Sequence, residues 1–593
     1  MNFRIRMEAM DDRGSRQKRV VWWAVGTLLL INLLLLLPVW IRHGRPGPHL
    51  FALEAGIVVG LFLVLPRRPW STLLAGAAGL LVTAASVLGF ADSAARMSLA
   101  RPLNLYLDVQ LVSAVANLLT GAVSGLWAAL ALGGGALAAI LLTGGVGYLL
   151  ARLRPGPDGS RAAASGTSTP GRGPSARLRR LRDAVLRPRS RAAGLALLVA
   201  CLLAIPLRWF HPRGVALGLP GVQLVQEQSR QLTRMLAERE RFAAEMSAAP
   251  GILPEGAMPL ARLGGRDVIL AFVESYGTTV LEDPRYAPVL LPRLEALETT
   301  LESRGLSIVT GRMVAPSQGG MSWLGHGSVL SGLWLENQLR YDLLLASDRT
   351  TLVDDFEAAG YRTVALMPAI TLAWPEGERF GYDEIYAFKD IDYAGPPLNW
   401  VTMPDQFTWS FLQEEILQEE TLGRDDARPV FAELGLISSH APWTPILPVL
   451  EDWDTIGDGR VFQRWAGAGE APKELWKDAE RVREHYARAV AYAVDVMGSW
   501  AAEFVDDGTL LIALGDHQPA PLITGDDAPR TVPVHIIARD PALTAPFRER
   551  GFVPGALPDP QAPVMRMDAF REWFVSSYSI PGPDSALVTR RQP

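Results

Sequence analysis

Cysteine is nearly absent from this 593-residue chain: Cys201 is the only one, and it falls within an apolar stretch. No disulfide framework can therefore form within the chain. The C-terminal part also lacks a basic surplus, since residues 212–593 carry 33 Lys and Arg against 54 Asp and Glu. A nucleic-acid-binding protein needs a basic surface, so this balance excludes nucleic acid as a partner. Residues 1–211 are basic instead, with 24 Lys and Arg against 8 Asp and Glu.

Long apolar segments occupy the first third of the chain. Residues 20–41 are almost wholly apolar, long enough to span a bilayer and too long for the core of a signal peptide. Four further apolar segments follow, at residues 50–66, 72–91, 123–150 and 192–210. The sequence therefore predicts an α-helical membrane domain over residues 1–211, with about five transmembrane helices.

Basic residues between these segments predict the orientation of the chain. Residues 152–191 hold 11 Arg and two Asp among Pro, Gly and Ser, which is typical of a cytoplasmic loop. The basic N-terminus lies on the same side, and an odd number of spans then places the rest of the chain outside. The predicted location is the cytoplasmic (inner) membrane, multi-pass, with an extracytoplasmic or periplasmic soluble part. Residues 102–119 are predicted to lie on the outer leaflet as an interfacial helix.

The remaining residues divide into a connection and a catalytic domain. Residues 212–260 are predicted to form a connecting helix, over 223–248, and a linker. From 261 to 593, strand and helix patterns alternate, which indicates an α/β domain with a mostly parallel sheet between helices. The expected strands are residues 268–273, 361–366, 430–437, 510–514 and 532–538.

Two of these strands end in residues that suit a metal ion. Asp516 and His517 follow a short apolar run and Gly515, and Glu274 follows another such run. Ligands of open α/β sheets bind at the carboxyl ends of strands, and carboxylate with imidazole suits Zn²⁺ or Mn²⁺. The alternative is a turn in which the acids act as caps and the histidine is exposed.

A glycine-containing stretch at residues 315–328 supplies a candidate nucleophile. It places Ser322 before an expected helix, where the helix dipole and free N–H groups favour an anion such as phosphate. A serine beside a divalent cation can ionise and attack. The alternatives are that Ser322 is only an N-cap, or that Ser317 is the nucleophile. His326 lies one turn further on the same helix face, as a substrate contact or as a packed side chain.

His440 follows the expected strand at residues 430–437. An imidazole at this position can hold a phosphoryl oxygen or protonate a leaving group. The alternative is a structural histidine.

Taken in chain order, these residues resemble the alkaline phosphatase and sulfatase superfamily. With five spans and an outward domain, the chain is similar in particular to the lipoteichoic acid synthase-type phosphoglycerol transferases. The resemblance implies that Glu274, Ser322, Asp516 and His517 hold one divalent metal ion, Mn or Zn with Mg possible. It further implies that Ser322 is the nucleophile and that His440 contacts the substrate.

The chain departs from the synthases at several positions. Those enzymes usually have Thr at the place of Ser322, and Ser supports the same chemistry. They also carry a histidine seven residues before a tryptophan and an arginine two residues after it. Trp374 fits this pattern, but Met367 and Glu376 occupy the other two places. Arg379, three residues further on, is the expected substitute, so Trp374 and Arg379 are predicted as substrate contacts.

Two other branches of the superfamily fit less well. Sulfatases need a Cys/Ser-x-Pro-x-Arg motif, whereas Ser322 is followed by Trp, Leu, Gly and His. Phosphoethanolamine transferases share the core and the topology but often have disulfides, which this chain cannot form. They remain an alternative.

The resemblance therefore implies a membrane phosphotransferase. A phospholipid would donate its head-group phosphoryl unit, phosphoglycerol-like, through a phospho-serine to a cell-envelope glycan or polymer. One alternative is a membrane-anchored phosphodiesterase or phosphatase that uses water as the acceptor. Another is a scaffold on a decayed enzyme fold, which the competent side chains at all four metal positions oppose.

Overall fold

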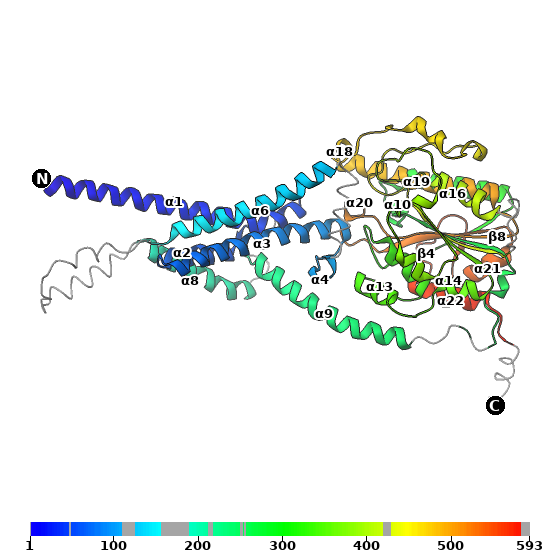
Figure 1. Ribbon diagram of the computed structural model, residues 1–593, viewed down its shortest axis with the longest axis horizontal. Helices are drawn as coiled ribbons and strands as arrows, with labels where there is room; N and C mark the ends of the chain where they lie inside the picture. Colours follow the sequence, from blue (N-terminus) through cyan, green and yellow to red (C-terminus); the bar gives the residue numbers. More distant parts are fainter. Residues whose placement is uncertain are drawn as a thin grey trace, which may run out of the picture. The chain divides into compact units, whose positions relative to one another are not determined.

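The computed structural model describes residues 2–46, 49–109, 125–155, 189–210, 217–248, 253, 256–418 and 428–582. The chain forms two compact units (Figure 1). The first contains Met1–Arg96 and Arg101–Thr233, and the second contains Met97–Ala100 and Arg234–Pro593. The boundary at Thr233 lies inside one helix, α9 (Pro220–Ala248), which occupies the position of the predicted connecting helix.

The first unit is helical, and each of the five predicted apolar segments falls on a helix. These helices are α1 (Asn2–Arg42), α2 (Leu53–Val64), α3 (Pro69–Leu99), α6 (Gly125–Leu153) and α8 (Arg189–Phe210). Three contain a segment long and apolar enough to cross a membrane, namely Val20–Arg42, Pro69–Leu99 and Gly133–Leu153. The apolar helices Leu53–Val64 and Ser190–Pro206 are shorter, so the predicted count of five spans is not confirmed.

Two predictions for this unit fall partly outside the described residues. Of the predicted interfacial helix over residues 102–119, only residues 102–109 are described, and they contain the four-residue helix α4 (Leu105–Asp108). Most of the basic loop predicted at residues 152–191 also lies outside it, from 156 to 188.

Glycines allow the apolar helices to approach each other closely. A Cβ at Gly60 of α2 would lie 2.9 Å from the backbone oxygen of Gly194 in α8, and one at Gly79 of α3 would lie 2.5 Å from that of Thr143 in α6. Helices packed in lipid gain little from the hydrophobic effect and rely on such close contacts between small residues. The glycines therefore fit the membrane location predicted for this unit.

The second unit is built on a nine-stranded sheet, with strand order β10-β4-β9-β8-β3-β7-β5-β6 and with β11 beside β4. The strands are β3 (Asp267–Val273), β4 (Ser307–Val314), β5 (Arg362–Met367), β6 (Glu384–Ala387), β7 (Val430–Leu436), β8 (Thr509–Gly515), β9 (Thr531–Ala538), β10 (Val553–Pro554) and β11 (Met565–Arg566). All five predicted strands are present. Apart from this sheet, β1 (Phe51–Ala52) and β2 (Leu217–Gly218) form a short pair in the first unit.

The sheet is mixed, and most of its strand pairs are parallel, as the sequence predicts. Strands β6, β5, β7, β3 and β8 run parallel, whereas β9 is antiparallel to both β8 and β4. Strand β9 is thus an exception within a mostly parallel sheet. Its eight residues are all buried, and a continuous apolar run looks the same in either direction. The connection from β8 contains only the four-residue helix α20 (Pro521–Thr524), so no long helix returns the chain for a parallel pairing.

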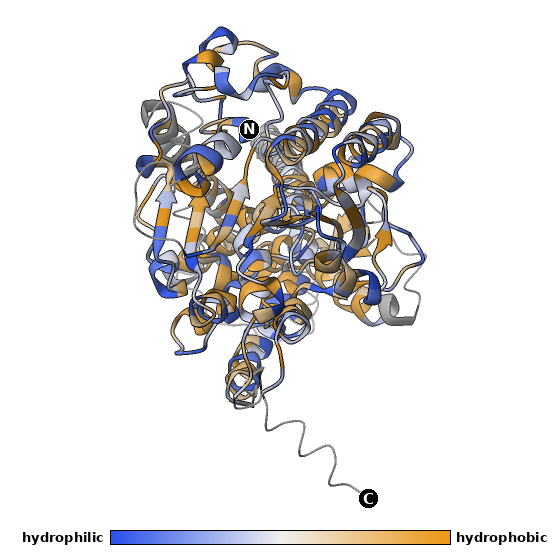
Figure 2. Cartoon of the chain, turned by 90° about the vertical axis from the view of Figure 1, so that its right-hand side faces the viewer, coloured by the Kyte–Doolittle hydropathy of each residue, from blue (hydrophilic) through white to orange (hydrophobic). Residues whose placement is uncertain are grey.

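Helices cover both faces of the sheet, as the alternation of strand and helix predicts (Figure 1). On one face, inward residues of β3 share a core with α11 (Ala287–Ser303), α16 (Asp405–Phe411) and α19 (Ala479–Phe504). On the other face, the alternate residues of β3 share a second core with α12 (Ser322–Ser331), α14 (Leu352–Ala358), α21 (Pro541–Glu549) and α22 (Phe570–Tyr578). Figure 2 shows orange, hydrophobic segments along the strands and the covering helices. This burial on both faces explains the unbroken apolar runs of the central strands.

The end of α9 belongs to the second unit. Arg340, in α13 (Gln338–Leu345), forms ion pairs with Glu238 and Glu245 of α9. Its guanidinium lies 4.8 Å from the centre of the Phe242 ring, and Phe242 is fully buried. Pairing of a buried guanidinium with two carboxylates offsets its desolvation, and these contacts join this half of α9 to α13 of the second unit.

A buried histidine links β9 to its neighbours on the sheet. The Thr310 hydroxyl donates to the Gly555 carbonyl at 2.7 Å, so its oxygen accepts the bond from His535 Nδ1 at 3.0 Å. The opposite ring nitrogen, Nε2, accepts from the Tyr276 hydroxyl at 2.9 Å. These bonds satisfy a neutral imidazole, and burial lowers the pKa of His535 to about 4.

This lowered pKa predicts a loss of stability in acid. An unfolded histidine has a pKa of about 6.5, so below that pH the unfolded chain binds a proton that the folded chain excludes. Stability should fall by about 3 kcal/mol in total as the pH drops from above 6.5 to below 4. The His535→Gln variant should lose less stability than the wild type over the same pH range. Thermal unfolding of the detergent-solubilised full chain at each pH measures this difference. Equal pH dependence of the two proteins would contradict the assignment.

Candidate metal and nucleophile site

The site lies at the carboxyl ends of three neighbouring strands. Strand β3 lies between β7 and β8 and is parallel to both, with Val273 opposite Leu436 on one side and Gly515 on the other. The chain therefore leaves all three strands at the same edge of the sheet. Glu274 follows β3 there, and Asp516 follows β8.

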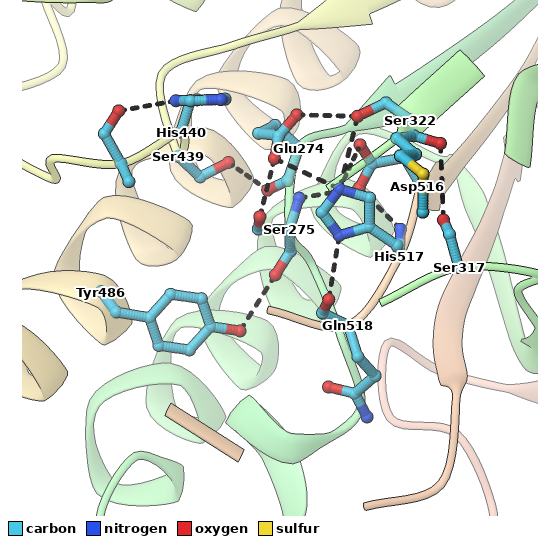
Figure 3. Close-up of polar contacts among 12 residues, drawn as sticks. Glu274, Ser275, Ser317, Ser322, Ser439, His440, Tyr486, Asp516, His517 and Gln518 are labelled. Carbon is cyan, nitrogen blue, oxygen red and sulfur yellow. Dashed lines mark hydrogen bonds and ion pairs between the residues drawn. The ribbon is translucent and has the colours of Figure 1, made fainter. Parts of the chain in front are cut away.

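Glu274, Asp516 and His517 form a compact group of possible metal ligands (Figure 3). One ligand atom from each lies within 4.8 Å of the others. His517 Nε2 is 3.5 Å from a carboxylate oxygen of Glu274 and 3.5 Å from one of Asp516. Asp516 and His517 are each 1% exposed and Glu274 is 9% exposed, so water screens their charges little.

The two carboxylates perturb each other strongly. Burial raises the pKa of Asp516, and the charge of Glu274 raises it further, to about 7. Burial also favours the neutral form of Glu274, but the charges of His440 and His517 outweigh this and bring its pKa to about 2. Two buried carboxylates and one imidazole are a donor set that fits a divalent cation such as Mn²⁺ or Zn²⁺.

Hydrogen bonds around the group fix which atoms face its centre. His517 Nδ1 donates to the Gln518 carbonyl at 2.9 Å, which leaves the Nε2 lone pair free. Asp516 Oδ1 accepts from the backbone N–H of Ser275 at 2.7 Å and from that of His517 at 2.6 Å. The Ser275 hydroxyl donates to Glu274 Oε1 at 2.7 Å. Such bonds orient metal ligands before a metal binds.

Ser322 completes this group. It is the first residue of α12, after Met321 in a left-handed conformation with φ 63°. Its Oγ lies 3.2 Å from Glu274 Oε2 and 3.3 Å from His517 Nε2. The structure thus brings together all four residues predicted as metal ligands. The Oγ of Ser317, the alternative nucleophile, instead lies 3.5 Å from the Met321 carbonyl oxygen.

His440 lies beside this group, in the chain that follows β7. Its Nδ1 donates to the Ala441 carbonyl at 2.6 Å, which leaves Nε2 for other partners. Its charge lowers the pKa of Glu274. The neighbouring Ser439 hydroxyl donates to the Glu274 carbonyl at 2.6 Å and ties the two strand ends together (Figure 3).

His326 lies one turn below Ser322 and contacts the sheet. Its Nδ1 is 2.8 Å from Glu433 of β7, whose other carboxylate oxygen accepts a bond from the Tyr382 hydroxyl. Its ring stacks on Phe272 at 3.7 Å. These contacts anchor α12 on the sheet, so His326 helps to fix the position of Ser322.

Trp374 and Arg379 have contacts of their own. Trp374 precedes α15 (Pro375–Phe380), and its ring lies against Gly377, where a Cβ would come within 2.3 Å of it. Arg379 Nε donates to the Leu345 carbonyl at 3.0 Å. Among the described residues, no hydrogen bond joins either side chain to the four residues predicted as metal ligands. Their role as substrate contacts stays a prediction.

Sequence inspection missed the residues that support His440. Trp400 stacks on the His440 ring with centroids 3.9 Å apart, and Asp405 accepts bonds from the backbone that leads to His440. Neither residue lies at the end of an apolar run or in a recognisable motif. Only the tertiary structure places them next to the site.

The metal-ligand group predicts stoichiometric metal binding. The purified full-length chain should bind about one equivalent of Mn²⁺ or Zn²⁺, because three donors converge in a site that is closed to water. Asp516→Ala removes one donor and should weaken binding by about tenfold or more. Elemental analysis after dialysis measures this, with the exposed Asp526→Ala as the matched control. A wild-type chain that stays metal-free in excess Mn²⁺ and Zn²⁺ would contradict the assignment.

Comparison with known proteins gives matches among solved structures. No family model and no curated protein matches the chain. The lipoteichoic acid synthase LtaP from Listeria monocytogenes matches with 14% identity over 52% of this chain and 70% of that one, at a TM-score of 0.34. The phosphoglycerol transferase GacH from Streptococcus pyogenes, in complex with sn-glycerol-1-phosphate, matches with 12% identity over 57% and 78%, at 0.34.

A third match is the zinc complex of the C-terminal periplasmic domain of EcEptC from Escherichia coli, with 15% identity over 54% and 84% of the two chains, at a TM-score of 0.34. At such identities and TM-scores these likenesses say nothing of what this chain binds or transfers. The resemblance predicted from the sequence is confirmed to this extent: the chain is similar to solved structures that include a lipoteichoic acid synthase and a member of the alkaline phosphatase superfamily.

Proposed function

We propose that this protein is an integral membrane, metal-dependent phosphotransferase with Ser322 as its nucleophile. One observation carries the proposal: the Ser322 Oγ lies 3.2 Å from Glu274 and 3.3 Å from His517, within the buried metal-ligand group. Ser322 also begins the ten-residue helix α12, whose free N–H groups favour an anionic phosphoryl group.

Glu274, Asp516 and His517 would hold the divalent ion, and Ser322 lies at the same centre. When bound, the ion supplies positive charge that stabilises the phosphoryl oxygens and lowers the pKa of the serine hydroxyl. The chain's own contribution is orientation: the bonds from Ser275 and Gln518 keep the ligand atoms turned toward this centre.

The proposed reaction has two balanced steps. In the first, Ser322 Oγ bonds to the phosphorus of a phosphodiester while the bond from phosphorus to the lipid alcohol oxygen breaks. The serine hydroxyl loses a proton, and the departing alcohol gains one, in this proposal from the His440 imidazole. In the second step, an acceptor hydroxyl bonds to the phosphorus and loses its proton while the bond from phosphorus to Ser322 Oγ breaks, and Oγ regains a proton.

The proposed donor is a membrane phospholipid, and the acceptor is a glycan or polymer of the cell envelope. The three helices that could cross a membrane support a lipid donor, since an enzyme for soluble esters needs only one anchor. In the proposed topology, α2 and α8 also cross, so that five spans place the catalytic unit outside the cytoplasmic membrane. His326, Trp374 and Arg379 stay predictions as substrate contacts. Phosphoethanolamine transfer and simple phosphodiester hydrolysis are the alternatives.

The transferase proposal predicts a trapped intermediate. Full-length protein in vesicles with head-group-labelled phosphatidylglycerol should release diacylglycerol, and acid quenching should leave labelled phosphoglycerol on Ser322. Ser322→Ala should lower turnover by about 10³-fold or more, because the nucleophile is lost. The matched control Ser317→Ala should keep nearly full activity. Mass spectrometry of the quenched protein and lipid chromatography measure both effects.

The acceptor distinguishes the transferase from the hydrolase. With envelope glycans present, label should move from the lipid to the glycan rather than to water. Release of only free phosphate or free head group would contradict the transferase and support the phosphodiesterase.

The basic loop predicts the topology. A reporter fused after Pro593 should be active only outside the membrane, and one inserted near Ser165 only inside. The reason is that the 11 Arg of residues 152–191 favour the cytoplasmic side. Reporter activity in intact cells measures this, and the reverse pattern would overturn both the span count and the location.

A further inference from the structure

A segment distant in sequence braces the loop that carries His440. Residues 398–407, called here the brace, precede β7, and residues 437–450, called here the His440 loop, follow it. The Asn399 side chain donates from Nδ2 to the Thr444 carbonyl at 2.5 Å. Gln406 donates from Nε2 to the Leu450 carbonyl at 2.7 Å and accepts from the Leu450 N–H at 3.0 Å. The two segments are therefore joined near both ends.

Asp405 holds the start of the His440 loop. Its side chain is fully buried, and Oδ1 accepts from the backbone N–H groups of Ile437 and Ser438, each at 2.8 Å. Its own N–H donates to the Ser438 hydroxyl at 2.8 Å. A buried carboxylate that accepts two backbone N–H bonds fixes that backbone tightly, because leaving either partner unpaired in the interior is costly.

Trp400 holds the ring of His440. The two rings stack with centroids 3.9 Å apart and planes 18° apart. The stack covers one face of the imidazole, and the bond from Nδ1 to the Ala441 carbonyl fixes the rotation of the ring. Of the two ring nitrogens, only Nε2 is left to meet a substrate.

Both segments contain a residue with a positive φ beside the stacked pair. Asn399 has φ 59° and Trp443 has φ 58°. The left-handed region suits asparagine but is unfavourable for a bulky residue such as tryptophan. Trp443 is held there by its Nε1 bond to the Ser439 carbonyl at 2.7 Å. Strain of this kind persists where the surrounding structure determines one geometry, and it is concentrated at functional sites.

We infer that Trp400 and Asp405 are positioning residues, which hold His440 Nε2 toward the phosphoryl group that Ser322 attacks. The inference rests on the proposed function. Asp405 fixes the backbone of the His440 loop, and Trp400 fixes the imidazole plane. Neither residue touches the reacting atoms, so each acts through His440.

A double-mutant cycle tests the inference, with bis(4-nitrophenyl) phosphate as the probe and the full-length protein in detergent. His440→Gln and Trp400→Ala should each lower kcat by about tenfold or more, with KM changed less than about threefold. In the His440→Gln background, Trp400→Ala should cost less than about twofold, because it acts only through the ring already removed. Trp400→Phe keeps a stacking ring and should recover most of the activity.

Controls separate positioning from general damage to the fold. Trp476 stacks on Trp443 in the same region but does not touch His440, so Trp476→Ala should keep nearly full kcat. Metal content and melting temperature of Trp400→Ala should match the wild type. Asp405→Asn keeps an Oδ1 acceptor and should retain activity. Asp405→Ala removes it and should lower kcat about as much as His440→Gln does.

The outcomes distinguish this inference from the proposed function. If His440→Gln has no effect, or if Trp400→Ala costs as much without His440 as with it, the inference is wrong. If Ser322→Ala retains wild-type activity in the same assay, the proposed function itself fails. Full activity of Trp400→Ala together with loss in Ser322→Ala would overturn only the role of the brace.

Discussion

Two carboxylates buried side by side are the constraint around which the catalytic unit is arranged. Glu274 and Asp516 follow adjacent parallel strands, and each is almost closed to water. Like charges this close cannot both ionise at low cost unless a positive charge lies between them. A divalent cation between them would supply that charge, with the neutral imidazole of His517 as a further ligand. The site is thus unfavourable by itself and would be completed by a cation.

The rest of the unit keeps these side chains in register. The central strands are buried on both faces, so a shift of one strand against another would expose apolar residues and is strongly opposed. Helix α19 reaches the site from one face through Tyr486, whose hydroxyl donates to the Ser275 carbonyl at 3.0 Å. Helix α12 reaches it from the other face, where the bond from His326 to Glu433 holds the helix against the sheet. Ser322 and the predicted metal ligands are therefore positioned by separate elements that share two continuous cores.

The prediction of elements from the sequence succeeded where burial dictates the pattern. The five apolar segments of the first unit fall on helices, and all five predicted strands of the second unit exist. The sequence did not show that β9 is antiparallel, because burial on both faces yields the same residues in a parallel and an antiparallel strand. Strand β4 was not predicted: Thr310, Gly311 and Arg312 interrupt its apolar pattern, and their contacts to β9, β10 and the chain beyond exist only in the folded sheet.

The sequence by itself determined which residue types stand at strand ends. A carboxylate or an Asp-His pair directly after a buried strand can be recognised in the sequence, since an apolar run and its end are local features. The tertiary structure alone decided which of these ends are neighbours, because strand order depends on the packing of the whole sheet. It also brought Ser322 rather than Ser317 to the carboxylates, through a turn with left-handed backbone at Gly319 and Met321. Trp400 and Asp405, which support His440, lie before β7 in the chain, whereas His440 lies after it. Residues that are related only through packing leave no recognisable spacing in the sequence.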